Sequence, residues 1–335
     1  MSEPGAVVVL APNWLGDAVM ALPALADIRR HFADQRLVVG ARPTVSSLFT
    51  LVPGVDSIVT TDISSLRGVR TSVAILFPNS FASAWAVKRA GIPERWGYSR
   101  DMRRLLLTRA IPRPRKAMHQ SEYYQHLVSA LGVDNGPREV TLIVPPNAVD
   151  QGRKILVDNG WSPDSALAVL APGAAYGKAK QWIPAHVVRL ITDLVRDRGM
   201  TCALVGSRGD APSTRAMRSA APADCQPRIL DLAGVTTLPV LSAIMSLARV
   251  CVSNDSGAMH LAAAAGVPTV AVFGPTNEHA TSPLARASVP IEVVSNAVWC
   301  RPCMLRECPI DHRCMTGIEP GQVLAAIDRI ARAVA

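Results

Sequence analysis

The first half of the sequence alternates short apolar runs with longer stretches that have the apolar spacing of helices. A β-branched run, Val7–Leu10, leads through a short turn into an apolar-periodic stretch from Asp17 to about Phe32. Further strand-like runs lie at Arg36–Gly40, Asp56–Thr60 and Val73–Phe77. Alternation of this kind is typical of a parallel sheet with helices on its faces. The pattern therefore predicts an α/β domain.

The alternation loosens between Pro137 and Asp150, where Pro145-Pro146 indicates a linker, and then restarts. Pro184–Arg198 has the pattern of an amphipathic helix, and Gly199 follows it in the position of a glycine C-cap. The other segments predicted in this half are strands at Ala166–Ala171, Thr201–Gly206, Val250–Ser253 and Thr269–Phe273, and helices at Leu238–Leu247 and Gly257–Ala265.

Both halves are thus expected to be open, doubly wound, Rossmann-like α/β sheets. The predicted parts are a first domain over residues 1–150, a second over 151–319, and a C-terminal helix over 320–335 that returns toward the first domain. In such sheets ligands bind beyond the carboxyl ends of the strands. Two facing domains would place a central cleft between them, which suits an enzyme that joins two substrates.

Length and composition agree with two globular domains. The chain has 335 residues, of which 49% are hydrophobic and 18% charged, and each half is long enough to bury its own core. The apolar run Ala6–Ala11 is too short for the apolar region of a signal peptide. Gly266, Pro268 and Gly274 interrupt the nearly uncharged stretch 256–277, so we interpret it as a buried helix and strand. We expect a cytoplasmic protein, soluble or peripheral on a membrane.

The net charge of +9 is concentrated in one segment. Between Lys88 and Lys116 ten basic residues stand against Glu94 and Asp101, a net charge of +8. One interpretation is a solvated basic face. Another is a docking surface for phosphorylated or membrane-associated anionic material. Nucleic acid is a weaker candidate, because no recognisable binding motif accompanies the charge.

The first candidate for chemistry is Asp17, in the stretch Ala11-Pro-Asn-Trp-Leu-Gly-Asp17, where a strand ends and a helix begins. Asp is a favoured N-cap residue, and this structural role is the simpler interpretation. The functional alternative is a general base that points beyond the strand end. A helix N-terminus keeps a carboxylate ionised but makes it a weaker base, so partial burial would have to offset that effect.

Two further segments have the features of phosphate-binding loops. Pro172–Trp182 follows a strand, contains Gly173 and Gly177, and carries Lys178 and Lys180 just before a helix. A solvated loop would explain the same residues. Neither this segment nor the second one, Val252–His260, has the Walker lysine pattern or a spaced G-x-G-x-x-G. Their absence argues against an ATPase and an ordinary dehydrogenase.

The second of these segments is Val252–His260. Gly257 would let backbone N–H groups and the Ser256 hydroxyl approach a phosphate closely. The Asp255 carboxylate could accept hydrogen bonds from sugar or ribose hydroxyls. His260 is open to two interpretations, a buried core histidine or a ligand contact beside the phosphate.

At these residues the sequence resembles glycosyltransferase family 9, the bacterial heptosyltransferases. The matching motifs occur in family order across nearly the whole chain. They are Asn13-Trp-Leu-Gly-Asp17, Phe77-Pro-Asn-Ser-Phe81, Ala90-Gly-Ile-Pro93 with Trp96-Gly-Tyr98, Pro172-Gly-Ala with Ala179-Lys-Gln-Trp182, Leu232-Ala-Gly234, and Asn254-Asp-Ser-Gly-Ala-Met-His260 through Phe273-Gly-Pro-Thr276. Ser256 stands where the family often has Thr, which keeps the hydroxyl.

The resemblance implies a GT-B fold and metal-independent, inverting transfer of L-glycero-D-manno-heptose from ADP-heptose to the first heptose of a Kdo–lipid A core. It implies that Asp17 deprotonates the acceptor hydroxyl and that Lys180 neutralises charge on the departing ADP. The donor-binding residues that it implies are Gly173, Ala174, Lys180, Leu232, Gly234, Asp255, Ser256, Gly257 and His260. For the lipid A-linked acceptor we expect Asn13, Asn79, Arg100, Arg103 and Arg104 in the first domain.

This activity would bring the protein to the inner face of the cytoplasmic membrane, and it raises the docking interpretation of the Lys88–Lys116 segment above the solvated face. No nucleic acid and no cofactor are expected. Two alternatives stay open. One is a family member with another heptose acceptor or nucleotide sugar. The other is a non-catalytic sugar-nucleotide-binding relative, which would be expected to have lost Asp17 or Lys180.

Four cysteines near the C-terminus have the spacing C-x2-C-x4-C-x5-C, and they are Cys300, Cys303, Cys308 and Cys314. Disulfides are disfavoured in the cytoplasm, so the cluster raises the hypothesis of a structural zinc or, less readily, an iron–sulfur cluster. The spacings are tighter than those of a usual pair of zinc knuckles. We expect no catalytic role for it.

Overall fold

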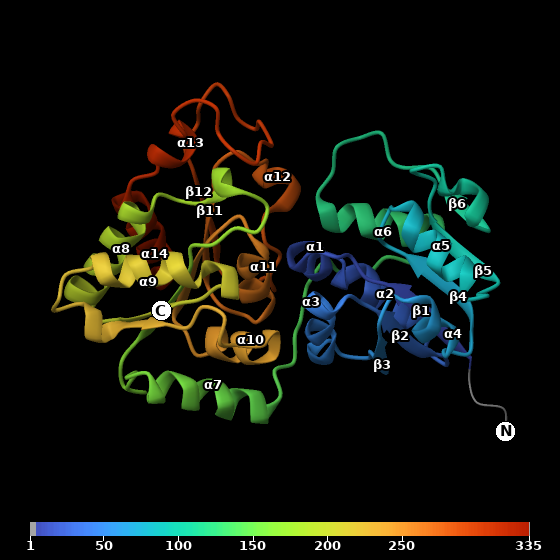
Figure 1. Ribbon diagram of the computed structural model, residues 1–335, viewed down its shortest axis with the longest axis horizontal. Coiled ribbons are helices and arrows are strands. Elements are labelled where there is room, and N and C mark those ends of the chain that lie inside the picture. Colours follow the sequence, from blue (N-terminus) through green and yellow to red (C-terminus); the bar gives the residue numbers. More distant parts are fainter. Residues whose placement is uncertain (1–4, 335) are drawn as a thin grey trace. The chain divides into compact units, whose positions relative to one another are not determined.

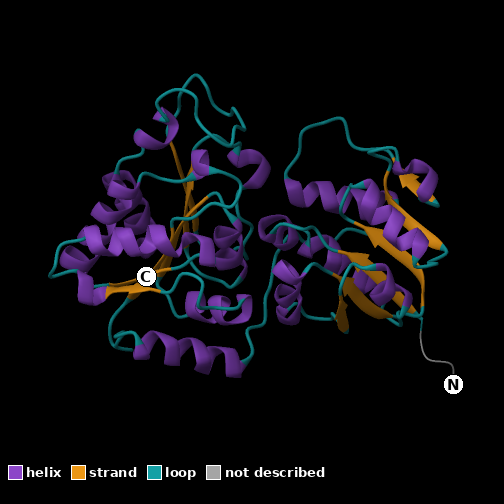
Figure 2. Cartoon of the chain, in the orientation of Figure 1, coloured by secondary structure: helices purple, strands orange, loops and turns teal. Residues whose placement is uncertain are grey.

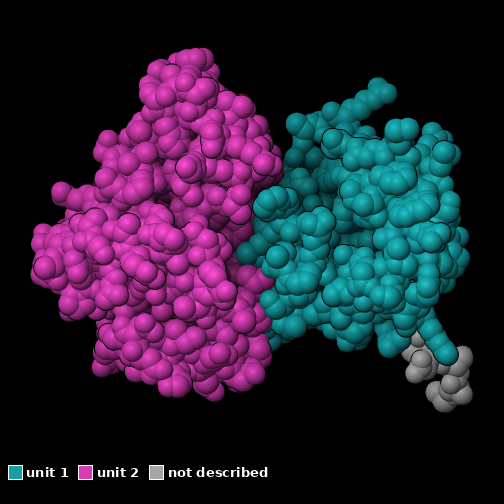
Figure 3. Space-filling view, in the orientation of Figure 1, with its two compact units in different colours: residues 1–143 teal, residues 144–335 magenta. Residues whose placement is uncertain are grey.

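A computed structural model of the protein describes residues 5–334. The chain divides into two compact units between Ile143 and Val144, coloured teal and magenta in Figure 3. The predicted boundary at residue 150 falls inside helix α7 (Pro146–Asp158). This helix packs closely on α10 (Leu238–Ser246), since a Cβ at Gly152 would lie 3.2 Å from the Ala243 side chain. The tight packing makes α7 part of the second unit.

Within residues 5–334 the first unit contains one six-stranded parallel sheet in the order β3-β2-β1-β4-β5-β6. Its strands are β1 (Ala6–Leu10), β2 (Arg36–Gly40), β3 (Ser57–Val59), β4 (Thr71–Leu76), β5 (Glu94–Tyr98) and β6 (Arg109–Ile111). Its helical segments are α1 (Leu15–Met20), α2 (Leu22–His31), α3 (Pro43–Ser46), η1 (Ser47–Leu51), α4 (Ile63–Arg67), α5 (Phe81–Arg89), η2 (Arg103–Leu106) and α6 (Gln120–Ala130). The strand order reverses between β1 and β4, as in doubly wound folds.

The described part of the second unit repeats this topology, with the strand order β12-β11-β10-β7-β8-β9. Its strands are β7 (Leu167–Ala171), β8 (Thr201–Leu204), β9 (Ile229–Asp231), β10 (Val250–Asn254), β11 (Thr269–Phe273) and β12 (Ile291–Ser295). Besides α7 and α10, its helical segments are η3 (Lys178–Lys180), α8 (Pro184–Arg198), η4 (Arg208–Asp210), α9 (Ala211–Ala220), η5 (Gln226–Arg228), α11 (Gly257–Ala264), α12 (Glu278–Thr281), α13 (Arg313–Thr316) and α14 (Pro320–Val334). The strand order reverses between β7 and β10.

The apolar runs become central strands because helices cover both faces of each sheet (Figure 2). Residues 6–10 and 167–171 are buried throughout, as expected for parallel strands with two covered faces. The predicted bounds of β2, α8 and β11 are confirmed, and Gly199 ends α8 with a left-handed φ of 61°. The apolar-periodic stretch from Asp17 to about Phe32 is helical, and it is divided at Ala21 into α1 and α2.

The C-terminal helix α14 packs in the second unit, beside α8 and β12 in Figure 1. Val323, Ala326 and Ile330 enter the core of this unit, and Arg198 pairs with Asp328 at 2.7 Å. Its apolar face is therefore used within the second unit, whereas the sequence prediction directed the helix toward the first. Among residues 5–334, none of the helices is both long and apolar enough to span a bilayer.

Candidate functional site

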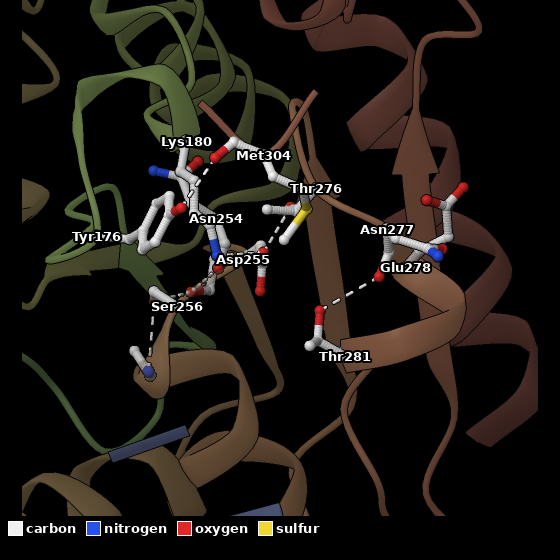
Figure 4. Close-up of polar contacts among 12 residues, drawn as sticks. Tyr176, Lys180, Asn254, Asp255, Ser256, Thr276, Asn277, Glu278, Thr281 and Met304 are labelled. Atoms are coloured by element: carbon white, nitrogen blue, oxygen red, sulfur yellow. Dashed lines mark hydrogen bonds and ion pairs between the residues drawn. The ribbon is translucent and has the colours of Figure 1, made fainter. Parts of the chain in front are cut away.

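In the second unit, three loops leave the carboxyl ends of neighbouring strands and meet beside the reversal of strand order. They are the loops after β7 (172–182), after β10 (255–256) and after β11 (274–277). Ser253 lies in register with Ala171, and Asn254 with Val272, so the three strands end at nearly the same level. Side chains from these loops contact one another in Figure 4. This edge is where doubly wound sheets bind ligands.

Asp255 is the centre of the polar contacts at this edge. Its Oδ2 accepts hydrogen bonds from Lys180 Nζ and from the Thr276 hydroxyl, each at 2.6 Å. The carboxylate is almost completely buried, and the Lys180 side chain is only 14% exposed. A buried charge is tolerated when it is paired and hydrogen-bonded, which is the case for Asp255. The predicted site residues Lys180 and Asp255 are thus brought together, and Thr276 joins them.

Asn254 holds the loop after β7 in place. Its side-chain oxygen accepts a hydrogen bond from Trp182 N at 3.1 Å, and its amide nitrogen donates to the carbonyl of Pro172. One buried side chain thereby fixes both ends of the segment 172–182. The sequence prediction gave no role to Asn254 or Thr276, although both lie in the motifs that carry the resemblance.

The helix α11 begins directly after Asp255. Ser256 is its N-cap residue and accepts a hydrogen bond from Ala258 N at 3.3 Å, so this hydroxyl caps the helix. Gly257 is the first helical residue, and its missing side chain leaves the N-terminal N–H groups approachable. His260 is buried in the same helix. A helix N-terminus beside an ammonium group favours an anion such as a diphosphate.

Two glycines of the predicted donor site are required by close approach. At Gly173 a Cβ would lie 2.5 Å from the Asp210 carboxylate. Gly234 has a φ of +78°, and a Cβ there would lie 2.7 Å from the backbone of Arg208. Leu232 is buried after β9, and Ala174 lies half-buried in the loop after β7. These four residues lie on loops at the carboxyl edge of the sheet, the same edge as Asp255.

The cysteine-containing segment lies against the loop after β7. Tyr176 donates a hydrogen bond to the carbonyl of Met304 at 2.8 Å, and Ala179 N donates to Arg306 O at 3.0 Å. The Lys180 ammonium and the Arg306 guanidinium lie 4.9 Å and 5.2 Å from the Tyr176 ring centre. Such cation–π contacts are favourable. Residues 304–306 therefore support the loop that carries Lys180.

The four clustered cysteines do not form a metal site in this structure. Cys314 is buried and Cys303 is exposed, while Cys300 and Cys308 are intermediate. The pKa of Cys314 is raised by burial and further by the nearby thiols of the other three. Within residues 5–334, however, no group of three or more His, Cys, Asp or Glu side chains is arranged to hold a metal ion. The structure therefore gives the zinc hypothesis no support.

In the first unit, Asp17 lies in the first turn of α1, beyond the carboxyl end of β1. The N-cap interpretation of Asp17 is wrong: Trp14 is the N-cap residue, because the helix begins at Leu15. Asp17 still experiences the positive end of the helix dipole. Its carboxylate lies near Tyr124 of α6, whose pKa is raised well above the usual value by burial and by the negative charge of Asp17. A phenol in such surroundings stays protonated.

Asn79 follows β4, on the other side of the strand reversal from Asp17. Its amide nitrogen donates to the Tyr123 hydroxyl at 2.9 Å, and its oxygen accepts from Arg103 at 3.4 Å. Asp17 and Asn79 are therefore at the edge where this unit would bind a ligand. Asn13 is half-buried in the loop before α1.

The three arginines predicted for the acceptor differ in their positions. Arg100 and Arg104 are exposed, but Arg103 is completely buried. The Arg103 guanidinium donates to the carbonyls of Tyr98 (2.8 Å) and Pro78, and burial lowers its pKa to about 10, which leaves it charged at neutral pH. A buried guanidinium that is bonded to the backbone cannot reach an acceptor. The structure thus corrects the expectation for Arg103, which joins η2 to β5 and to the loop after β4.

These features define a class of α/β protein with two doubly wound units, the second of which has an ammonium group and a helix N-terminus beside a strand reversal. The sequence profile of glycosyltransferase family 9 (heptosyltransferase) matches residues 59–313. The chain therefore belongs to this family and is a glycosyltransferase.

Similar proteins agree with this assignment over most of the chain. Lipopolysaccharide heptosyltransferase 2 of Escherichia coli K12 is 28% identical over 308 residues, which is 86% of this chain and 88% of that protein. Lipooligosaccharide heptosyltransferase 2 of Campylobacter jejuni serotype O:2 is 25% identical and spans 93% and 94% of the two chains. The solved structure of E. coli ADP-heptose lps heptosyltransferase II has a TM-score of 0.84 at 26% identity and covers 97% of this chain and 98% of that chain. The predicted GT-B fold class is confirmed.

Proposed function

We propose that this glycosyltransferase moves L-glycero-D-manno-heptose from ADP-heptose onto the first heptose of a Kdo–lipid A inner core, in lipopolysaccharide biosynthesis. Relatives named lipopolysaccharide or lipooligosaccharide heptosyltransferase 2 match most of the chain and support this assignment. The observation that carries it is the Lys180–Asp255 pair beside the N-terminus of α11, at the reversal of strand order. We infer inversion at the anomeric carbon and no requirement for a cofactor or catalytic metal.

The donor end of the proposed mechanism uses the second unit. Lys180 lies where its ammonium group can move from Asp255 to the diphosphate and neutralise the charge that grows as ADP departs. The N–H groups at the start of α11 add donors for the same phosphates. Asp255 Oδ2 already accepts two hydrogen bonds, so we assign its Oδ1 to a hydroxyl of the heptose. Leu232 and Gly234 would lie beside the nucleotide.

The acceptor end uses Asp17. The acceptor hydroxyl oxygen attacks the anomeric carbon from the face opposite ADP, and the bond from that carbon to the phosphate oxygen breaks. The bonding pair leaves with ADP, and the hydroxyl proton passes to the Asp17 carboxylate. A single displacement of this kind inverts the configuration. General base catalysis of this type contributes on the order of a hundredfold to ten-thousandfold in rate.

The acceptor itself carries anionic groups on a membrane-embedded lipid. We propose that Asn13, Arg100 and Arg104 contact it, while Arg103 positions the loop that bears Arg100 and Arg104 and also bonds to Asn79. The protein would then act in the cytoplasm, peripherally on the inner face of the cytoplasmic membrane.

The direct test is to incubate the purified protein with ADP-heptose and a heptosylated Kdo–lipid A acceptor, and to follow ADP release and product mass. We expect stoichiometric ADP and a product heavier by one heptose. Transfer only to another acceptor, or only from another nucleotide sugar with release of its own nucleoside diphosphate, would replace the proposed substrate by that one. Binding of ADP-heptose with no transfer to any acceptor would instead indicate a non-catalytic relative.

A further inference from the structure

The turn before β6 presents two apolar side chains to solvent. Met102 is 91% exposed and Leu105 is 89% exposed, the highest values among the large exposed hydrophobic residues in the described part of the chain. Leu105 lies in η2 and Met102 is its N-cap residue, so the two exposed side chains are only three residues apart in one turn of the chain. Leu106 and Leu107, which follow, are buried. Exposure of this extent costs hydration free energy in a free protein.

The turn is firmly anchored, so the exposure of these side chains is a built feature. Between Met102 and Leu105 the chain inserts Arg103, which is completely buried and donates to Tyr98 O at 2.8 Å and to Ser83 Oγ at 3.3 Å. These bonds fasten η2 to β5 and to the first turn of α5. Asp101 and Met102 have left-handed φ values of 51° and 58°, which non-glycine residues adopt at a cost. The anchored backbone thus directs Met102 and Leu105 outward.

Basic residues surround this turn in the sequence. Eight residues of the segment 88–116 are basic and exposed, and they are Lys88, Arg89, Arg100, Arg104, Arg109, Arg113, Arg115 and Lys116. Exposed aromatic side chains lie on α5, which contacts η2: Phe81 and Trp85 stack at 6.2 Å between ring centres, and Arg89 lies over Trp85. Apolar tips together with basic charge are the combination that binds the interface of an anionic bilayer.

We propose that η2, with Met102 and Leu105 at its tip, inserts into an anionic lipid surface while the exposed basic residues of 88–116 bind the lipid phosphates. Two side chains offer too little area for a stable protein interface, which buries about 1,200–2,000 Å² in total, whereas shallow insertion needs only a few apolar groups. The inference deepens the proposed function, on which it rests for the choice of a membrane as the partner.

The test is co-sedimentation of the full-length protein with vesicles of equal parts phosphatidylglycerol and phosphatidylcholine, and with vesicles of phosphatidylcholine alone. The wild type is expected to bind the anionic vesicles, less so at high salt, and to bind the neutral vesicles weakly. The double variant Met102→Gly/Leu105→Ser should bind the anionic vesicles about tenfold or more weakly. Glycine suits the left-handed φ of residue 102, so this variant is expected to fold, as thermal unfolding would verify.

Val157→Ser serves as the matched control, because Val157 is an exposed apolar residue (46%) on α7 of the second unit and should leave vesicle binding unchanged. The inference is overturned if the double variant binds anionic vesicles like the wild type, or if the wild type prefers neutral vesicles. It is also overturned if the variant only converts a dimer to a monomer, since the surface would then join two copies of the chain.

A parallel assay with a soluble, deacylated acceptor separates this inference from the proposed function. If the wild type and the double variant both transfer heptose normally and bind vesicles equally well, only the membrane-binding inference is rejected. If the variant loses vesicle binding but the wild type transfers no heptose, the proposed function is rejected and the membrane-binding inference is kept.

Discussion

Lys180 and Asp255 form an ion pair of 2.6 Å that joins the loops after β7 and β10, with side chains only 14% and 4% exposed. The pair spans the point where the strand order of the second unit reverses. Because both groups are largely removed from water, each depends on the other: removing one partner of a buried pair costs about 3–5 kcal/mol. The same lysine is the one assigned to the departing ADP. This one contact therefore affects both the stability of the folded protein and the binding and release of ADP.

This coupling can be measured with a double-mutant cycle of Lys180→Ala and Asp255→Asn. Each single variant should weaken ADP binding and lower turnover together, because Lys180 supplies the charge and Asp255 positions it. We expect the two effects on the free energy of ADP binding to be non-additive by about 1 kcal/mol or more. Isothermal titration calorimetry with ADP measures it. Additive effects would mean that the Lys180–Asp255 interaction is the same in the free and the ADP-bound protein, which would contradict the movement of the ammonium group from Asp255 to the diphosphate.

Thr276 offers a milder change at the same carboxylate. Thr276→Val removes the hydroxyl that donates to Asp255 Oδ2 but nearly preserves the side-chain shape, and it should lower the free energy of unfolding by about 1–3 kcal/mol. Thr276→Ser keeps the hydroxyl and is the matched control. Urea denaturation compares the two. If Thr276→Ser were as destabilising as Thr276→Val, the methyl group rather than the hydrogen bond would be responsible.

Neighbouring arginines provide the clearest contrast in stability. Arg103→Ala leaves the carbonyls of Tyr98 and Pro78 without their buried donor and creates a cavity, so it should cost about 3 kcal/mol or more in the free energy of unfolding. Arg104→Ala alters an exposed side chain and should change the free energy of unfolding by less than about 0.5 kcal/mol. Denaturant unfolding of the two variants decides the matter, and equal stabilities would contradict the role given to Arg103.

Turnover is expected to be independent of divalent metal, because Lys180 and the first turn of α11 supply the positive charge for the diphosphate. A chelator should leave the rate of heptose transfer unchanged. Metal analysis by inductively coupled plasma spectrometry, made on the same preparation, tests the cysteine cluster separately. Loss of activity on chelation that added Mg²⁺ or Zn²⁺ restores would contradict the proposed charge neutralisation.

The strongest patterns in the sequence gave the correct framework. Long apolar runs such as Thr269–Phe273 become parallel strands because both faces of the sheet are covered, and their ends define the edge where the site lies. The motif order then placed Lys180 and Asp255 on loops that the structure brings into contact. Periodicity and motif order were sufficient to predict these strands and loops, because the strands are marked by local apolar runs and each motif directly follows a strand.

Other features depend on contacts that local sequence does not reveal. The strand β5 (Glu94–Tyr98) was hidden within a segment interpreted by its charge, because its arginine, tryptophan and glycine do not form an apolar run. Arg103 looks like its exposed neighbours in sequence, and only tertiary packing shows that it is buried. Asp17 was open to an N-cap interpretation because the exact start of a helix is poorly determined by residue preferences.

The measurement that tests the account most directly is heptose transfer by Asp17→Asn, with ADP-heptose binding determined on the same preparation. The amide keeps the size of the side chain but cannot accept the proton. The exposed Asp34→Asn of the same unit is the control and should transfer heptose normally. We predict that turnover of Asp17→Asn falls at least about a hundredfold while the Kd for ADP-heptose stays within about twofold of wild type. Near wild-type turnover by this variant would contradict the assignment of Asp17 as the base.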